Sequence, residues 1–314
     1  MYVKGIKGKD GYTCPAKSGG GCASGCRNCH NSTEKIQNKY YFLFDLISGR
    51  SSLRPTFAEM PKDLDGQPEV IDFIFKYIGY EYEIETDGFY EKIKQAIDGG
   101  KPVLARVKND GEGAFRVLTG YKNGKLITAN PQGAQGKPKV PKSKEIAELI
   151  LIGSEIKPQY NFLDALKRIE KIMTENAKTD VWGDCIKQFF YFGDWQIKDV
   201  NAKEMKRRFK RINDIAYYNF NSHNFMEAFS HRMPDELKDA RFDEIIKSIA
   251  VSYDKAHTLN WQLAALYQLR CWKNRAYTEI EWGYNTCVIK TLKQLSECDN
   301  EVLAAVKQAI RILE

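Results

Sequence analysis

The sequence has few histidines, no long apolar run and no strong excess of either charge. Only four of its 314 residues are histidines, and the formal net charge is +7 at pH 7. No stretch reaches the ~18 consecutive apolar residues of a membrane-spanning helix, so we expect no membrane partner. This net charge is small for a chain of this length, and the sequence contains no motif of a known nucleic-acid-binding domain. Both observations argue against a nucleic-acid partner.

The beginning of the sequence also lacks the apolar core of a secretory signal, so we expect a cytoplasmic protein with reduced cysteines. The one dense basic run is Lys203–Arg211. Met205, Phe209 and Ile212 recur through it at helical spacing. We therefore interpret the run as the exposed face of a helix whose other face is buried.

Up to about residue 157 the patterns alternate between helix and strand. Helices are expected at 22–47, 70–79, 89–97 and 144–148, and strands at 80–84, 102–107, 114–121, 125–130 and 149–156. Asn123-Gly124 predicts a two-residue hairpin turn. Residues 50–68 hold three prolines and are expected to form a surface excursion. Together these patterns predict an α+β domain over residues 1–157.

After Lys157-Pro158 nearly every pattern is helical. Helices are expected at 161–176, 180–192, 202–219, 234–252, 255–272, 275–297 and 299–313. Four leucines are spaced as one buried helical face: Leu259, Leu263, Leu266 and Leu269. Residues 158–314 are therefore expected to form an all-α domain.

Residues 18–31 (SGGGCASGCRNCHN) hold three of the eight cysteines behind a run of glycines. Cys22, Cys26 and Cys29 have the spacing of the radical-SAM cluster motif, and Cys14 could supply a fourth ligand for zinc or a full cluster. The proline-bearing segment that follows does not match the rest of the radical-SAM pattern. A metal or iron–sulfur site remains an alternative.

The same residues permit a nucleophilic cysteine. Cys22 directly follows the glycines at the start of the expected helix, where free backbone N–H groups and the helix dipole stabilise a thiolate. Cys26 and Cys29 would then lie in the core as small apolar side chains. A nucleophilic cysteine also needs a base, commonly a histidine.

A family resemblance rests on four stretches: residues 22–28 (CASGCRN), 99–107 (GGKPVLARV), 113–121 (GAFRVLTGY) and 126–131 (LITANP). They resemble the papain-like bacteriocin-leader (double-glycine) peptidases. The N-terminal domain of the butirosin biosynthesis acyltransferase family is more similar still. The helix-rich remainder is also similar to C-terminal regions of bacterial proteins of this type. The resemblance implies a papain-like cysteine-peptidase fold with an antiparallel sheet, followed by the helical domain.

Carried onto this sequence, the resemblance makes Cys22 the nucleophile and Asn130 the residue that orients the histidine. Ala114 stands where the family has the histidine itself. The family's oxyanion-binding glutamine has no clear counterpart, and Ser18 is the nearest polar residue. An alanine cannot accept a proton, so a general-base contribution of ~10²–10⁴-fold is lost. The other histidines (His30, His223, His231 and His257) are not expected to replace it.

Two explanations for Ala114 remain open, a natural pseudoenzyme or an inactive variant of an active enzyme. The chemistry implied is acyl transfer from a thioester or amide through an S-acyl cysteine, with hydrolysis as the peptidase variant. The implied substrate is a peptide or an acyl thioester, including one linked to a carrier protein, and no cofactor is expected. A non-catalytic binding module that uses the same cleft is the other hypothesis.

Overall fold

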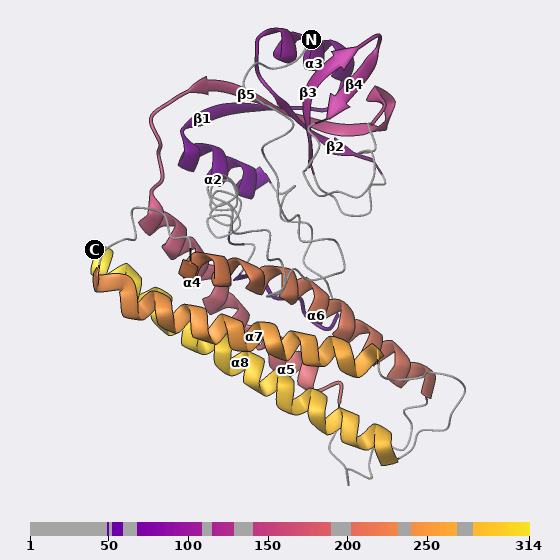
Figure 1. The fold of residues 1–314 in the computed structure, drawn as a ribbon, viewed down its shortest axis with the longest axis vertical. Coiled ribbons are helices and arrows are strands. Elements are labelled where there is room, and N and C mark those ends of the chain that lie inside the picture. The colour runs from indigo at the N-terminus through magenta and orange to yellow at the C-terminus, as the bar shows by residue number, and fades with distance from the viewer. Residues whose placement is uncertain are drawn as a thin grey trace. The chain divides into compact units, whose positions relative to one another are not determined.

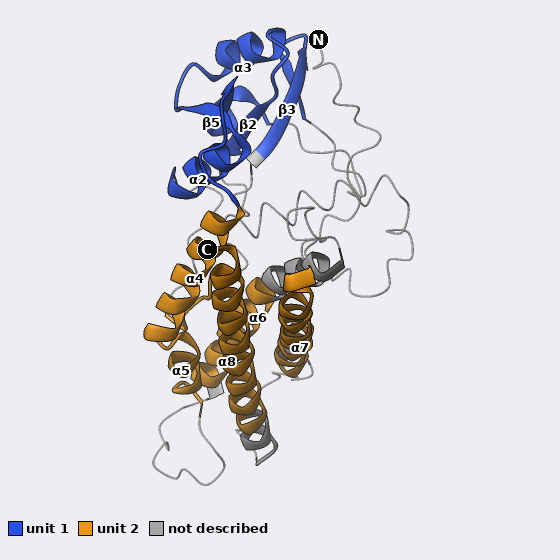
Figure 2. Ribbon diagram, turned by 90° about the vertical axis from the view of Figure 1, so that its left-hand side faces the viewer, with its two compact units in different colours: residues 1–41, 63–161 blue, residues 42–62, 162–314 orange. Residues whose placement is uncertain are grey.

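The computed structural model describes residues 49, 52–58, 68–108, 115–128, 141–189, 202–231, 240–268 and 279–314. The chain divides into two compact units (Figure 2). The first comprises residues 1–41 and 63–161, and the second residues 42–62 and 162–314. The predicted boundary at Lys157-Pro158 falls in the connection between the last strand of the first unit and the first helix that follows. The assignment of a papain-like domain to residues 1–157 stays a prediction.

The first unit is built on one antiparallel sheet of five strands in the order β1-β5-β2-β3-β4. The strands are β1 (Tyr80–Glu85), β2 (Val103–Val107), β3 (Phe115–Lys122), β4 (Lys125–Thr128) and β5 (Ile146–Glu155). The helices are α2 (Pro68–Ile78), α3 (Phe89–Asp98) and the short 3₁₀ turn η4 (Ser143–Glu145). The predicted α+β class with an antiparallel sheet is confirmed.

The two helices cover opposite faces of this sheet (Figure 1). Successive side chains of a strand point to opposite faces. Accordingly Val103 and Ala105 of β2 are buried with Ile93 of α3, whereas Leu104 packs with Phe75 of α2. The sheet therefore has an apolar core on each side.

Two turns explain why the elements of the first unit end where they do. Asn123 and Gly124 both have positive φ, at 49° and 73°, as a type I′ hairpin requires. Gly79 (φ 75°) separates α2 from β1. The Asn123-Gly124 turn predicted from the sequence is confirmed.

The second unit is helical in its described part. Its helices are α4 (Phe162–Lys178), α5 (Val181–Ile186), α6 (Ala202–His231), η6 (Ala240–Phe242), α7 (Asp243–Gln268) and α8 (Glu279–Leu313). Helix α7 packs between α6 and α8, and both α4 and α5 pack on α8 (Figure 1). Among the described helices, none combines the length and the apolar character that a membrane crossing demands.

Several helices predicted from the sequence have the wrong bounds. The helix expected at 180–192 ends at Ile186, and most of the one expected at 144–148 belongs to strand β5, which begins at Ile146 after the 3₁₀ turn. The helix expected at 202–219 continues to His231, since no glycine or proline interrupts it. The pair expected at 234–252 and 255–272 is one helix, α7, along which Ile249, Tyr253 and Ala256 remain buried at helical spacing. The pair expected at 275–297 and 299–313 is also one helix, α8.

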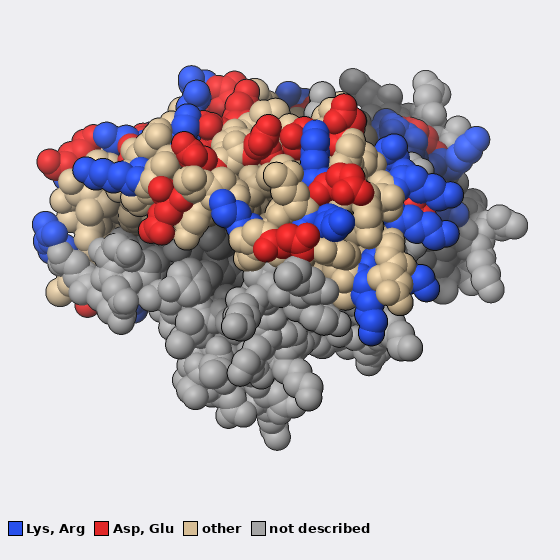
Figure 3. Space-filling model, turned by 90° about the horizontal axis from the view of Figure 1, so that it is seen from above, with Lys and Arg blue, Asp and Glu red and all other residues tan. Residues whose placement is uncertain are grey.

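The basic run lies on α6 as predicted. Met205, Phe209 and Ile212 are buried in the core of the second unit. Glu204 accepts hydrogen bonds from Arg207 and Arg208, which hold the pKa of its carboxyl at about 2. On the face drawn in Figure 3, lysines and arginines are likewise interspersed with aspartates and glutamates.

The predicted surface excursion at residues 50–68 is wrong for the segment 52–58, which we call the strap. Ser52, Arg54, Pro55 and Phe57 are all buried. The strap belongs to the second unit although it precedes the whole sheet of the first unit in sequence. Its buried side chains make it part of the interior of that unit.

Candidate functional site

The residues predicted to carry chemistry lie outside the described part of the chain. They are Cys22, Ala114 and Asn130 of the papain-like hypothesis, and Cys14, Cys26 and Cys29 of the metal hypothesis. Ser18, His30 and the side chains of His223 and His231 also lie outside it. His257, the remaining histidine, is half-buried on α7. How these residues lie relative to one another therefore stays a prediction.

The strands that flank two of these positions are described. Strand β3 begins one residue after Ala114, and β4 ends two residues before Asn130. Leu118 pairs with Thr128, and Lys122 pairs with Lys125 beside the turn. The start of β3 and the end of β4 therefore lie at the same end of one hairpin.

Two of the three described cysteines are poor nucleophiles. Cys185 and Cys298 are buried, and burial raises the pKa of their thiols to about 12 and about 11. Cys287 on α8 is exposed. Within the described ranges, no three histidine, cysteine, aspartate or glutamate side chains are grouped so that they could hold a metal ion.

The first unit has a broad hollow of about 730 Å³ over β1, β5 and α3. Lys92 lies in it and forms ion pairs with Glu85 and Asp87, whose hydrogen bonds raise the pKa of the lysine. Lys101 donates to the Gly153 carbonyl at 2.6 Å. Because β1 and β4 are the opposite edges of the sheet, this hollow is not at the strand ends next to positions 114 and 130.

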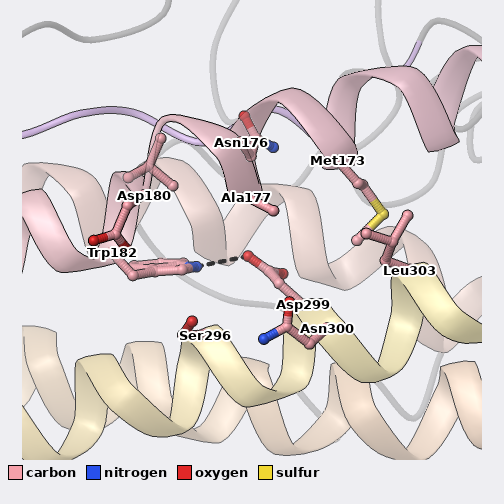
Figure 4. A pocket seen from close by; sticks show the side chains of 10 residues that line it. Met173, Asn176, Ala177, Asp180, Trp182, Ser296, Asp299, Asn300 and Leu303 are labelled. Atoms are coloured by element: carbon pink, nitrogen blue, oxygen red, sulfur yellow. Dashed lines mark hydrogen bonds between the residues drawn. The ribbon is translucent and has the colours of Figure 1, made fainter.

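The second unit has a smaller pocket of about 200 Å³ between α4, α5 and α8 (Figure 4). Its lining mixes apolar with polar side chains: Met173, Asn176, Ala177, Asp180, Val181, Trp182, Ser296, Asp299, Asn300 and Leu303. The Trp182 indole N–H donates to Asp299 Oδ2 at 2.7 Å, shown dashed in Figure 4. This bond ties α5 to α8 at the floor of the pocket.

Asp299 is also held from the strap. Arg54 Nε donates to Oδ2 at 2.8 Å and Nη2 donates to Oδ1 at 2.7 Å. Burial opposes the charge on Arg54, but Asp299 and the Tyr253 hydroxyl outweigh it and raise the pKa of Arg54. Asp299 therefore accepts hydrogen bonds from both the strap and α5.

This ion pair is the main polar feature that the sequence did not reveal. Arg54 and Asp299 lie 245 positions apart, and local periodicity cannot connect them. The only local signal was the presence of Phe57 and Leu53 beside an arginine and a proline, which does not predict burial.

No protein-family model matches the chain, and no curated protein matches it in sequence. Membership of the papain-like family therefore stays a prediction from the motifs.

Proposed function

We propose that the protein is a papain-like, cysteine-dependent acyltransferase or peptidase relative that works in the cytoplasm. Cys22 is the nucleophile of this site, Asn130 belongs to its orienting side, and Ala114 occupies the position of the base. The observation that carries the proposal is the hairpin of β3 and β4.

The family pattern needs its base beside the start of one strand and its orienting residue beyond the end of the next. Here β3 starts directly after Ala114, and β4 ends two residues before Asn130. The pairing of Leu118 with Thr128 brings these two strand ends to the same end of the hairpin. This arrangement supports a shared site, since consecutive Cα atoms are only about 3.8 Å apart.

The proposed chemistry proceeds through an S-acyl cysteine. The Cys22 thiolate attacks the carbonyl carbon of a thioester or amide, and the bond to the leaving thiol or amine breaks as the leaving group takes up a proton. An acceptor amine then attacks the S-acyl group, releases the thiolate and loses a proton. With water as the acceptor the same site is a peptidase.

Ala114 makes a second function a specific alternative. Without a base at position 114 the thiol loses a contribution of roughly 10²–10⁴-fold. A cleft that retains its walls but not its base can bind a peptide or an acyl thioester without turnover. This binding module is the second candidate.

The reactivity of Cys22 separates the two candidates. We would incubate the full chain with iodoacetamide, and separately with an acyl thioester, and then locate the adducts by intact mass and peptide mapping. Cys287 is exposed and will react, so the measurement uses a Cys287→Ser background. A Cys22→Ala variant in the same background is the matched control.

Selective labelling of Cys22, faster than that of the other cysteines, supports the acyl-transfer site. Cysteines that all react at one slow rate favour the binding module. A brown colour or bound zinc in the purified protein, lost on Cys26→Ser substitution, would instead support the metal site of Cys14, Cys22, Cys26 and Cys29.

A further inference from the structure

The strap is held by the second unit in the way that a receptor holds a bound peptide. Residues 53–56 have no helix or strand, and the strap's backbone groups bond to side chains of the helices. The Phe57 N–H donates to Asp184 Oδ2 at 3.1 Å, and the Phe57 carbonyl accepts from Arg211 Nε at 2.8 Å. Asn176 Nδ2 donates to the Ser52 carbonyl at 2.6 Å. All three hydrogen bonds are made to backbone groups of the strap, so they do not depend on its side chains.

Two side chains of the strap are deeply buried and lie three positions apart. The Arg54 side chain is 1% exposed, meets Asp299 with two hydrogen bonds, and lies within hydrogen-bonding reach of the Tyr253 hydroxyl. Phe57 is 7% exposed and packs in the core of the second unit, with the Arg207 guanidinium carbon 5.8 Å from its ring centre. Buried anchors of this kind dominate peptide and protein recognition.

We propose that the surface beneath the strap is a peptide-binding groove for an extended segment with an arginine and a phenylalanine three positions apart. The strap is its tethered ligand within the chain. A separate peptide of the same chemistry is the partner that the groove accepts when the strap is released. The inference does not depend on the chemistry proposed at Cys22.

The groove should select strongly at one position and weakly at another. A planar guanidinium fits the two oxygens of Asp299, and a lysine cannot reproduce this two-pronged contact. Ala58, at the end of the strap, is exposed. Arginine should therefore be required at position 54 of the peptide, and serine tolerated at position 58.

The tether explains why the strap would stay in place even if the groove binds peptides weakly. A segment joined by a short linker has an effective concentration on the order of 1 mM at its site. A groove with a Kd of about 10 µM would then be occupied by its own strap about 99% of the time. A free peptide can compete only after the tether is cut.

The test therefore cuts the chain after it has folded. A specific protease sequence is inserted once within residues 42–48 and once within residues 59–67 of the full chain. The purified protein is cleaved at both sites and incubated with an excess of fluorescent peptide covering residues 50–60. Retained label is measured by size-exclusion chromatography, and folding by far-ultraviolet circular dichroism. The uncut protein serves as the blank.

We expect the cleaved, folded protein to exchange its strap for the labelled peptide and the uncut protein not to do so. A peptide with Arg54→Lys should bind at least about tenfold more weakly, and one with Ala58→Ser about as well as the native peptide. Three results would each overturn the proposal: a cleaved protein that stays folded without exchanging, a cleaved protein that unfolds, or equal binding of the Arg54→Lys peptide. Equal uptake by the uncut protein would do the same, since it would show binding elsewhere.

Discussion

Arg54 and Asp299 form a two-pronged ion pair inside the second unit although 245 positions separate them in the sequence. The side chain of Arg54 is 1% exposed and that of Asp299 is 17% exposed. The pair fastens the strap to α8. Because the arginine is the more deeply buried partner, loss of the counterion should cost more for Arg54 than for Asp299.

Substituting Asp299 should destabilise the protein more than substituting Arg54. Asp299→Asn keeps an acceptor for the Trp182 N–H but leaves the Arg54 cation buried without its counterion. Removal of one partner of a buried pair costs about 3–5 kcal/mol of unfolding free energy. Arg54→Met should cost less, since the remaining carboxylate is partly hydrated. Urea unfolding followed by circular dichroism measures both.

An exposed pair in the same unit provides the control. Lys210 donates to Asp214 at 2.9 Å on α6, and their side chains are 62% and 38% exposed. Asp214→Asn should cost less than about 1 kcal/mol, because water screens such pairs. If Asp299→Asn costs no more than Asp214→Asn, the strap is not held by its ion pair.

Two glycines with the same backbone conformation should respond differently to alanine. Gly79 has φ 75° and Gly124 has φ 73°. A Cβ at Gly79 would lie 2.6 Å from the Ile156 carbonyl oxygen, whereas a Cβ at Gly124 would meet nothing within 4 Å. The Ile156 N–H donates to the Gly79 carbonyl at 2.9 Å, which keeps the two backbones close.

Gly124→Ala should therefore cost about 1 kcal/mol, the penalty for a left-handed non-glycine residue. Gly79→Ala should lower the free energy of unfolding by that amount and by a further contribution from the clash with the Ile156 carbonyl oxygen. The two variants are compared by thermal unfolding of the full chain. Equal losses would mean that the connection between α2 and β1 moves away from the new methyl group.

Much of the first unit could be predicted because its signals are local. Alternating residues predict the strands, and Asn123-Gly124 predicts the turn between β3 and β4. The strap could not be predicted, since Arg54 is buried only because Asp299 supplies a counterion from α8. The order of the family motifs predicts the roles of Cys22, Ala114 and Asn130. These roles remain predictions, because the three residues lie outside the described part of the chain.

The second unit shows the same limit at a helix boundary. The sequence patterns predict one helix that ends at 297 and another that starts at 299. In the structure α8 runs without a break from Glu279 to Leu313, and the Asp299 carboxylate within it accepts hydrogen bonds from Arg54 and Trp182. These contacts come from residues distant in sequence, so local patterns could not predict them.

Stability should fall at alkaline pH through the buried thiol of Cys185. Burial raises the pKa of this thiol to about 12, whereas in the unfolded chain it ionises near its ordinary value of about 8.5. Between these values the unfolded state loses a proton that the folded state keeps, so unfolding is favoured as pH rises. Below the ordinary thiol pKa both states keep the proton, so the contribution of Cys185 to the free energy of unfolding does not change with pH. Cys298 and Tyr253 add losses of the same sign.

The measurement compares the unfolding free energy near pH 8 with that about two pH units higher, on either side of the ordinary thiol value. Cys185→Ala should make the decline shallower, although the variant starts from a lower stability. Cys287→Ala removes an exposed thiol and should leave the decline unchanged. A decline that is the same in all three proteins would assign it to groups other than Cys185.

Introducing a histidine at position 114 tests whether the site lacks only its base. If Cys22 and Asn130 retain the family arrangement, Ala114→His should raise acyl-thioester turnover by roughly 10²–10⁴-fold. The rate should rise with pH through a pKa of about 6.5, since neutral imidazole is the base. Ala114→Gln supplies a polar side chain of similar size that accepts no proton, so it should stay at the starting rate.

The double variant Cys22→Ala/Ala114→His identifies the nucleophile. A gain that disappears in the double variant and is absent from Ala114→Gln requires both a thiol at 22 and a base at 114. Such a result places the two residues in one site, because proton transfer demands hydrogen-bonding distance. Equal rates for the histidine and glutamine variants would instead mean that the Cys22 thiol does not lie within hydrogen-bonding distance of position 114. The cleft would then be a binding site only.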